Sequence, residues 1–333
     1  RRIRRIVPAL FFVILITLPL FFLNMSSGIL WDYFQSLFSV TIFMSNFLFA
    51  LENNYFDIAS KFKPFIHTWS LAVEEQFYII FPIIFLILWK IKYNYIIYFL
   101  LLLLTISFVV CLYNYSIKIP IENFTIERFN SLGWGSFFMP FGRFWELLAG
   151  SVASLILKNY RIQNSNFIST IGFLILIFSF FYINEEVQYP GVSTIFPVLG
   201  TFLIIIFSTK SSNLVNLLLS NKILVFVGLI SYSLYLWHQP IFTFFNLIYF
   251  KEYFYIKIFL QILVILLLSF LTWKYIELPF RDKNKVKSKI LWIIFIISSA
   301  LIIVVAVLGN SKFGRDLHSH TLSLNINENY RNM

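Results

Sequence analysis

Charged residues and cysteine are both scarce in this chain of 333 residues. Only 12% of its residues are charged, whereas a soluble globular domain carries about 25%. The single cysteine, Cys111, can form no disulfide framework and no cysteine cluster for a metal. The four histidines are not grouped at zinc-ligand spacing, so we expect no structural or catalytic metal.

Apolar and aromatic residues take the place of the missing charges. Hydrophobic residues make up 59% of the chain, aromatic residues 20%, and the mean hydropathy is +0.81. Repeated apolar runs that approach or exceed about 18 residues indicate transmembrane helices, whereas a membrane barrel would show short alternating strands. We therefore predict an all-α polytopic membrane protein, a multi-helix transmembrane bundle with about nine spans.

The distribution of lysine and arginine predicts the topology of this bundle. We expect spans at 6–23, 70–89, 94–113, 138–157, 167–183, 192–209, 223–249, 256–276 and 290–309. Placing the loops richest in Lys and Arg in the cytoplasm follows the positive-inside rule. These loops are 1–5, 90–92, 158–161, 210–222 and 281–289. The net charge of +11 is thus spread between spans, so we expect lipid and not nucleic acid as the partner of these charges.

One further apolar run, "SLFSVTIFMSNFLFA" at 36–50, is short and interrupted by Ser and Asn. Reading it as a span would reverse every later segment and place the basic residues at 90–92 outside. We therefore expect a re-entrant or interfacial segment on the outer side.

The stretch "HTWSLAVEEQFY" places two carboxylates within an apolar run. On a helix, His67, Ser70, Glu74 and Tyr78 would share one face, and Glu75 would point about 100° away from it. A carboxylate in contact with hydrocarbon is costly, so this stripe should face the bundle interior or a water-filled cavity. A function is the default expectation for an intramembrane carboxylate. The alternative is that Ser70 and Tyr78 merely satisfy Glu74 inside a packed bundle.

The stretch "GRFWELLAG" contains Arg143 and Glu146, three residues apart on one helical turn. This spacing is typical of a structural ion pair. A guanidinium group would equally suit an anionic substrate group such as a phosphate. The sequence leaves both interpretations open.

The stretch "ISYSLYLWHQP" places Ser231, Tyr235 and His238 on one helical face. A lone histidine in a helix is commonly a satisfied buried residue. The pKa of histidine also suits proton transfer near neutral pH, so a catalytic role for His238 stays open.

Four arginines occupy the beginning of the chain, "RRIRRIVP". At a cytoplasmic membrane boundary, Arg1, Arg2, Arg4 and Arg5 can serve as a topology anchor that contacts lipid headgroups. They can also bind a polyphosphate, because arginine binds phosphate groups bidentately.

The motifs "HTWSLAVEEQFY", "GRFWELLAG", "ISYSLYLWHQP" and "YIELPFRD", in this order, resemble the membrane acyltransferase-3 family, whose members O-acylate bacterial surface glycans. The likeness extends to about residue 282. It implies that 1–282 is a membrane acyltransferase domain without the first two of the family's ten helices. A basic loop and an extra transmembrane helix at 283–309 would follow. The last segment, 310–333, would be an extracytoplasmic linker toward a missing SGNH-type domain.

The resemblance also implies a function. We expect an O-acyltransferase of the bacterial inner (cytoplasmic) membrane that transfers an acyl group, expected to be acetyl, from cytoplasmic acyl-CoA. The acceptor would be a hydroxyl of lipopolysaccharide O-antigen, peptidoglycan or exopolysaccharide. The donor acetyl-CoA would bind at Arg1, Arg2, Arg4 and Arg5. The candidate catalytic residues are Glu74, Glu75, His67, Arg143, Glu146 and His238, while the family's own catalytic histidine lies in the first helix, which this sequence lacks.

A transporter or flippase for a lipid-linked glycan is the alternative function. Such a protein would also need intramembrane carboxylates. The sequence shows no clear inverted repeat and no pair of corresponding broken helices, which many transporters have. A purely structural scaffold is disfavoured by the polar stripe around Glu74.

Overall fold

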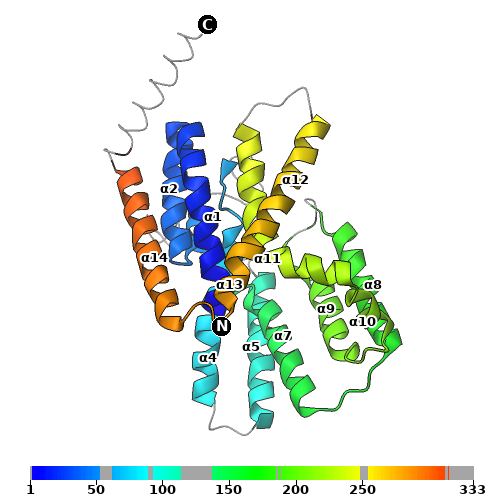
Figure 1. Cartoon of the computed structure of the whole chain (residues 1–333). Coiled ribbons are helices and arrows are strands. Elements are labelled where there is room, and N and C mark those ends of the chain that lie inside the picture. The colour runs from blue at the N-terminus through cyan, green and yellow to red at the C-terminus, as the bar shows by residue number, and fades with distance from the viewer. Residues whose placement is uncertain are drawn as a thin grey trace, which may run out of the picture. The chain divides into compact units, whose positions relative to one another are not determined.

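The computed structural model describes residues 2–52, 62–88, 93–113, 137–184, 187, 189–247, 254–311 and 314, and these residues form helices joined by turns. In chain order the helices are α1 (Arg2–Asn24), α2 (Ser27–Thr41), α3 (Ser45–Glu52), α4 (Thr68–Leu88), α5 (Tyr93–Tyr113), α7 (Phe144–Asn159), α8 (Asn166–Tyr182), η2 (Val192–Thr194), α9 (Ile195–Phe207), α10 (Leu214–Leu219), α11 (Lys222–Leu247), α12 (Phe254–Thr272), η3 (Trp273–Glu277), α13 (Leu278–Arg281) and α14 (Ser288–Asn310) (Figure 1). The predicted all-α class is confirmed for the described part of the chain.

Among the described residues, six helices are long and apolar enough to cross a membrane. They are Arg2–Asn24, Thr68–Leu88, Tyr95–Leu112, Lys222–Leu247, Phe254–Arg281 and Ser288–Asn310. The other three expected spans also contain helices, but α7, α8 and α9 have only 16, 17 and 13 residues. A single membrane crossing takes about 20 residues, so the count of about nine spans is not confirmed.

The run at 36–50 is divided between two helices. α2 already begins at Ser27 and has 15 residues, and α3 has 8. The break lies around Phe43, whose φ of 55° is unusual for a residue with a side chain. Neither helix reaches the length of a membrane crossing. The re-entrant or interfacial placement of this segment remains a prediction.

The chain divides into two compact units, and we describe each by itself. The first unit contains Arg1–Leu48, Asn53–Thr68 and Phe226–Met333. The second unit contains Phe49–Glu52 and Trp69–Val225. The predicted boundaries at 282 and 309 are a different division of the chain, and they remain predictions.

In the first unit, α14 packs along α1 and α2 (Figure 1). The ring of Phe11 in α1 stacks on the ring of Phe295 in α14, with 5.9 Å between the ring centroids. Gly309 of α14 faces the ring of Phe34 in α2, where a Cβ atom would overlap the ring. The glycine therefore permits the close approach of α14 to α2.

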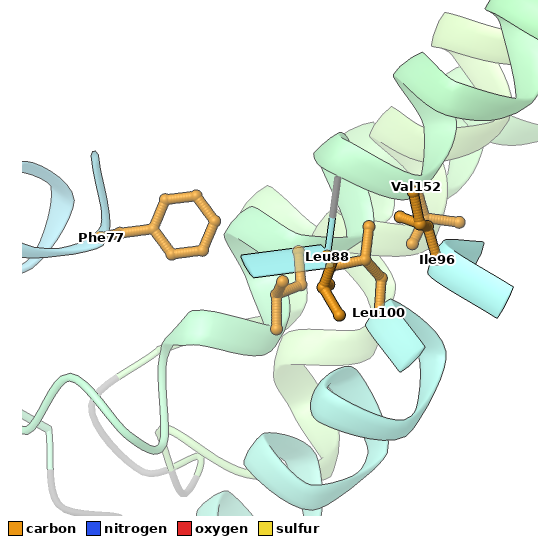
Figure 2. Close-up of a cluster of buried hydrophobic side chains, with 6 residues drawn as sticks. Phe77, Leu88, Ile96, Leu100 and Val152 are labelled. Atoms are coloured by element: carbon orange, nitrogen blue, oxygen red, sulfur yellow. The ribbon is translucent and has the colours of Figure 1, made fainter. Parts of the chain in front are cut away.

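In the second unit, apolar side chains fix α7 against its neighbours. The core cluster consists of Phe77, Leu88, Ile96, Leu100, Leu148 and Val152. Figure 2 shows Leu88 of α4, Ile96 and Leu100 of α5, and Val152 of α7 gathered at one place. Because close-packed side chains resist displacement, this cluster holds α7 in a defined position. The polar residues at the start of α7 are positioned by the same packing.

Candidate functional site

The first candidate site lies at the beginning of α7 in the second unit. The hydroxyl of Ser107 on α5 accepts a hydrogen bond from the backbone N–H of Trp145, with 2.9 Å between the nitrogen and the oxygen. The same hydroxyl donates to the backbone carbonyl of Phe141. These two bonds tie α5 to the turn before α7. They fix the backbone on both sides of Arg143.

The guanidinium group of Arg143 is enclosed by aromatic rings. Its carbon lies 5.3 Å from the ring centroid of Trp69, 5.0 Å from that of Phe137 and 4.5 Å from that of Tyr189. The Nε atom donates to the carbonyl of Phe137 at 3.3 Å. Only 4% of the side chain is exposed. Arginine stacked on aromatic faces and bonded in this way has little freedom to move.

Arg143 also forms the ion pair that the spacing suggested. Its terminal nitrogen lies 2.9 Å from Oε1 of Glu146, and 28% of the Glu146 side chain is exposed. The two residues are therefore unequal: the cation is buried and the carboxylate reaches open space. Removing the anionic partner would leave a buried cation without a counter-charge, which strongly destabilises a protein. Each residue therefore holds the other in place.

Glu146 lines two cavities of the second unit. The smaller one, of about 280 Å³, is also lined by Tyr189, Thr194 and Thr201. The larger one, of about 800 Å³, lies between α4 and α7 and is mainly apolar. Arg143 lines neither of these two cavities. Any chemistry in them would thus use the carboxylate of Glu146, and Arg143 would act by positioning it.

The carboxylates predicted on α4 are half-buried in the structure. Ser70, Glu74 and Tyr78 follow one another at intervals of four residues within α4, so they share a helical face as expected. The side chains of Glu74 and Glu75 are both half-buried, and Tyr78 lines the larger cavity. Glu74 and Glu75 do not line either of the two cavities beside Glu146. Their catalytic roles remain predictions.

The prediction that His67 belongs to the same helical face is wrong. α4 begins at Thr68, and His67 lies in the turn before it. The chain turns here because the N–H of Thr68 bonds to the carbonyl of Phe65 at 3.0 Å, and the Thr68 hydroxyl bonds to the same carbonyl. His67 consequently faces α11 within the first unit.

His67 and His238 form the second candidate site. Their ring centroids are 4.9 Å apart, and the ring of Tyr235 lies 4.8 Å from that of His67. The hydroxyl of Tyr235 donates to the backbone carbonyl of His67 at 2.6 Å. Burial, and to a smaller extent the nearby His238, lowers the pKa of His67 well below its ordinary value. A neutral imidazole can accept a proton, as a general base must.

The predicted face of α11 is only partly used in this arrangement. Tyr235 and His238 both contact His67, whereas the hydroxyl of Ser231 bonds to the carbonyl of Gly228 at 2.8 Å. No pattern in the sequence predicts the pairing of His67 with His238. Only the fold brings these distant positions together.

The arginines at the beginning of α1 are engaged in the first unit to different degrees. Arg4 is buried, and its guanidinium donates to the carbonyls of Phe280 and Val286 and to the hydroxyl of Ser288. Arg4 therefore fastens the loop before α14, which is a structural role. Arg2 is half-buried, and Arg1 lies outside the described residues.

Arg5 meets a buried carboxylate that we did not predict as a site residue. Oε1 of Glu277 lies 3.5 Å from Nε of Arg5 and 3.3 Å from a terminal nitrogen of Arg281. Oε2 of Glu277 accepts from the hydroxyl of Ser233 at 3.3 Å. The Glu277 side chain is 0% exposed, while those of Arg5 and Arg281 are 46% and 39% exposed. One carboxylate thus holds two guanidinium groups that remain open to a ligand.

Glu277 also ends the π-helical segment η3, and such segments are frequent at functional sites. The available signal was an acidic residue at the end of an apolar run, in "YIELPFRD".

Within the described residues, no group of three or more His, Cys, Asp or Glu residues could hold a metal ion.

Comparison with known proteins gives a consistent result. The model of the acyltransferase-3 family, described as an acyltransferase domain, matches residues 1–307. A protein of Staphylococcus aureus strain COL, provisionally named an O-acetyltransferase, is 30% identical over 299 residues. The O-acetyltransferase OatA of S. aureus strain NCTC 8325 / PS 47 is 29% identical over 298 residues.

Each of these alignments covers 85% of this chain and 47% of the relative, so the chain spans about half the length of the curated relatives that it matches. No solved structure matches the chain.

Proposed function

Because the chain belongs to the acyltransferase-3 family, we propose that it is the membrane domain of an O-acetyltransferase acting on a surface glycan. The observation that carries the proposal is the family match over residues 1–307, joined with relatives that are named O-acetyltransferases. The membrane-competent helices support a multi-pass protein, which we assign to the bacterial inner (cytoplasmic) membrane. The segment 310–333 would lead to an extracytoplasmic SGNH-type domain.

The donor in this proposal is cytoplasmic acetyl-CoA. Its phosphates would bind at the beginning of α1, where Arg5 keeps much of its guanidinium exposed. Arg1 and Arg2 would contribute to the same binding. Arg4 would contribute indirectly, because its bonds to 280–288 keep this end of the first unit in shape.

The acceptor in this proposal is a hydroxyl of O-antigen, peptidoglycan or exopolysaccharide. The hydroxyl oxygen attacks the thioester carbonyl, its proton passes to a general base, and the C–S bond breaks to release CoA as the thiol. Glu146 is our first candidate for the base or for an acceptor-binding group, because it is the ion-paired carboxylate that reaches two cavities. His67 and His238 are candidates for proton transfer, and Glu74 and Glu75 for binding the acceptor.

A genetic experiment separates this function from the transporter alternative. The full-length gene is restored in a deletion strain, and the surface glycans are analysed for ester-linked acetyl groups by mass spectrometry. We expect the deletion strain to export the glycan normally but without the acetate, and the restored gene to return the acetate. Loss of the glycan from the surface would instead overturn the enzymatic proposal in favour of transport.

A further inference from the structure

A cavity of about 290 Å³ lies between α11 and α12 in the first unit, and its lining contains none of the residues discussed above. The ring of Phe242, one of its lining residues, lies 6.1 Å from the ring of His238. Its lining consists of Gln239, Phe242, Asn246, Phe254, Lys257, Ile258 and Gln261. Its volume is at the small end of ligand pockets, which run from about 300 to 1,000 Å³. The cavity therefore suits a group the size of one sugar ring better than a larger molecule.

The polar residues of this cavity come from two facing helical stripes. Gln239, Phe242 and Asn246 follow at intervals of three and four along α11, so they share a face. Phe254, Lys257 and Gln261 follow in the same way along α12. Both helices belong to the group long and apolar enough to cross a membrane. Polar side chains that converge between such helices mark a functional site by default.

The chemistry of the lining matches a saccharide. Three carboxamides supply both N–H donors and carbonyl acceptors, which are what sugar hydroxyls and N-acetyl groups require. The rings of Phe242 and Phe254 supply apolar surface for the C–H face of a pyranose, and both are partly exposed. Among the described lining residues only Lys257 is charged, so a sugar that carries a carboxylate would bind more tightly than a neutral one.

The polar side chains of this cavity have hydrogen-bonding groups that a ligand could use. Gln261 is only 7% exposed, its amide bonds to no other described residue, and it lines the cavity, so a ligand there could supply the missing partner. The ammonium of Lys257 donates to Oδ1 of Asn246 at 2.9 Å. That bond orients Asn246. Among the described residues no other group bonds to the N–H groups of Asn246 or to the two remaining N–H bonds of Lys257, so these donors are available to a ligand.

We propose that the cavity lined by Gln239, Asn246, Lys257 and Gln261 binds one sugar ring of the acceptor glycan. In the topology predicted from Lys and Arg, the adjoining ends of α11 and α12 lie on the outer side, where a surface glycan is found. The identification of this sugar as the acceptor rests on the proposed acyltransferase function. The binding of a saccharide at this place does not depend on it.

The test measures saccharide binding without acyl donor, on the detergent-solubilised full-length protein, by saturation-transfer difference NMR. The probes are a neutral oligomer of N-acetylglucosamine and an acidic oligomer of galacturonate. We expect Gln239→Ala and Gln261→Leu to weaken binding of both probes about three- to tenfold, the value of one net hydrogen bond. Lys257→Met should weaken the acidic probe more than the neutral one.

The matched control is Lys222→Met, which removes the same charge from the other, exposed end of α11. We expect it to bind both probes like the wild type. Size-exclusion profiles identify misfolded variants, which are left out. If Gln261→Leu does not fold, Gln239→Ala and Lys257→Met, which lie at partly exposed positions, still test saccharide binding.

Failure of binding by both probes, or equal binding by all variants, overturns the saccharide site. If anionic phospholipid vesicles alone displace the saccharide signal, the saccharide site is also overturned, because the cavity would then hold a lipid headgroup. Variant-sensitive sugar binding in a protein that transfers no acetyl group supports the site and overturns the acyltransferase proposal instead.

Discussion

The guanidinium of Arg143 lies 2.9 Å from the carboxylate of Glu146, and of the two only Glu146 lines the cavities beside it. Three aromatic rings and the carbonyl of Phe137 hold the cation in place. The pair therefore keeps the carboxylate of Glu146 at a fixed place beside open space.

The first prediction concerns the order of action in this pair. Arg143→Lys keeps the charge but loses the planar fork and its stacking, so we expect glycan acetylation to fall at least about tenfold. If Arg143 acts only through Glu146, the same change in a Glu146→Gln background should cause little further loss. Acetate per glycan, measured by mass spectrometry on equal amounts of protein, gives the two ratios. The control is Arg161→Lys at an exposed position. Two independent, additive losses would show that Arg143 has a role of its own.

The second prediction concerns the hydrogen bond that joins Tyr235 to His67. Tyr235→Phe preserves the ring that packs on His67 and removes the donor to its carbonyl. We expect a loss of about 1 kcal/mol in the free energy of unfolding, together with lower acetylation. Thermal unfolding in detergent measures the first effect. Tyr255→Phe, at an exposed position of α12, is the control. A Tyr235→Phe protein as stable and as active as the wild type would show that this contact is dispensable.

The third prediction follows from the lowered pKa of His67. In the folded protein His67 stays neutral below its ordinary pKa of about 6.5, whereas in the unfolded chain it binds a proton. The contribution of neutral His67 to stability should therefore be fully present above pH 6.5 and be lost as the pH decreases below that value. Replacing His67 with Asn should make the melting temperature less sensitive to pH between 7.5 and 5.5.

The control for this pH dependence is Tyr255→Phe at an exposed position of α12, which should retain the pH dependence of the wild type. Equal slopes of melting temperature against pH for the wild type and His67→Asn would contradict the assignment.

The fourth prediction concerns Glu277, the carboxylate shared by Arg5 and Arg281. Glu277→Gln removes the charge that holds the two guanidinium groups together. We expect a loss of about 1–3 kcal/mol in the free energy of unfolding and a higher KM for acetyl-CoA, because Arg5 would no longer be held in position. Asp32→Asn, at an exposed position of α2, is the control. A KM equal to that of the wild type would remove Arg5 and Glu277 from the donor site.

Local features of this protein could be predicted from the sequence, because they depend on runs and spacings. Long apolar runs located α1, α4, α5, α11, α12 and α14, and the three-residue spacing suggested the Arg143–Glu146 pair. α2 was missed over its first turns, because Asp32 and Gln35 interrupt the apolar run there. The start of α4 was misplaced by the turn that orients His67 toward α11.

Contacts between distant segments could not be predicted in the same way. The approach of His67 to His238 and of Arg5 to Glu277 depends on the packing of α1, α11 and η3, which no local pattern encodes. Glu277 itself was visible in the sequence as a carboxylate near the end of an apolar run. Its importance became apparent only when both of its arginine partners were known.

The most direct test of the account follows label from the donor to the glycan. Membrane vesicles that contain the full-length protein receive acetyl-CoA labelled in the acetyl group, and the label that base releases from the glycan is counted. We predict base-labile label with the wild type and about a hundredfold less with Glu146→Gln, the loss expected for a general base. Unchanged label with a normally abundant Glu146→Gln protein would contradict the role of Glu146, and no labelled ester with the wild type would contradict the acyltransferase itself.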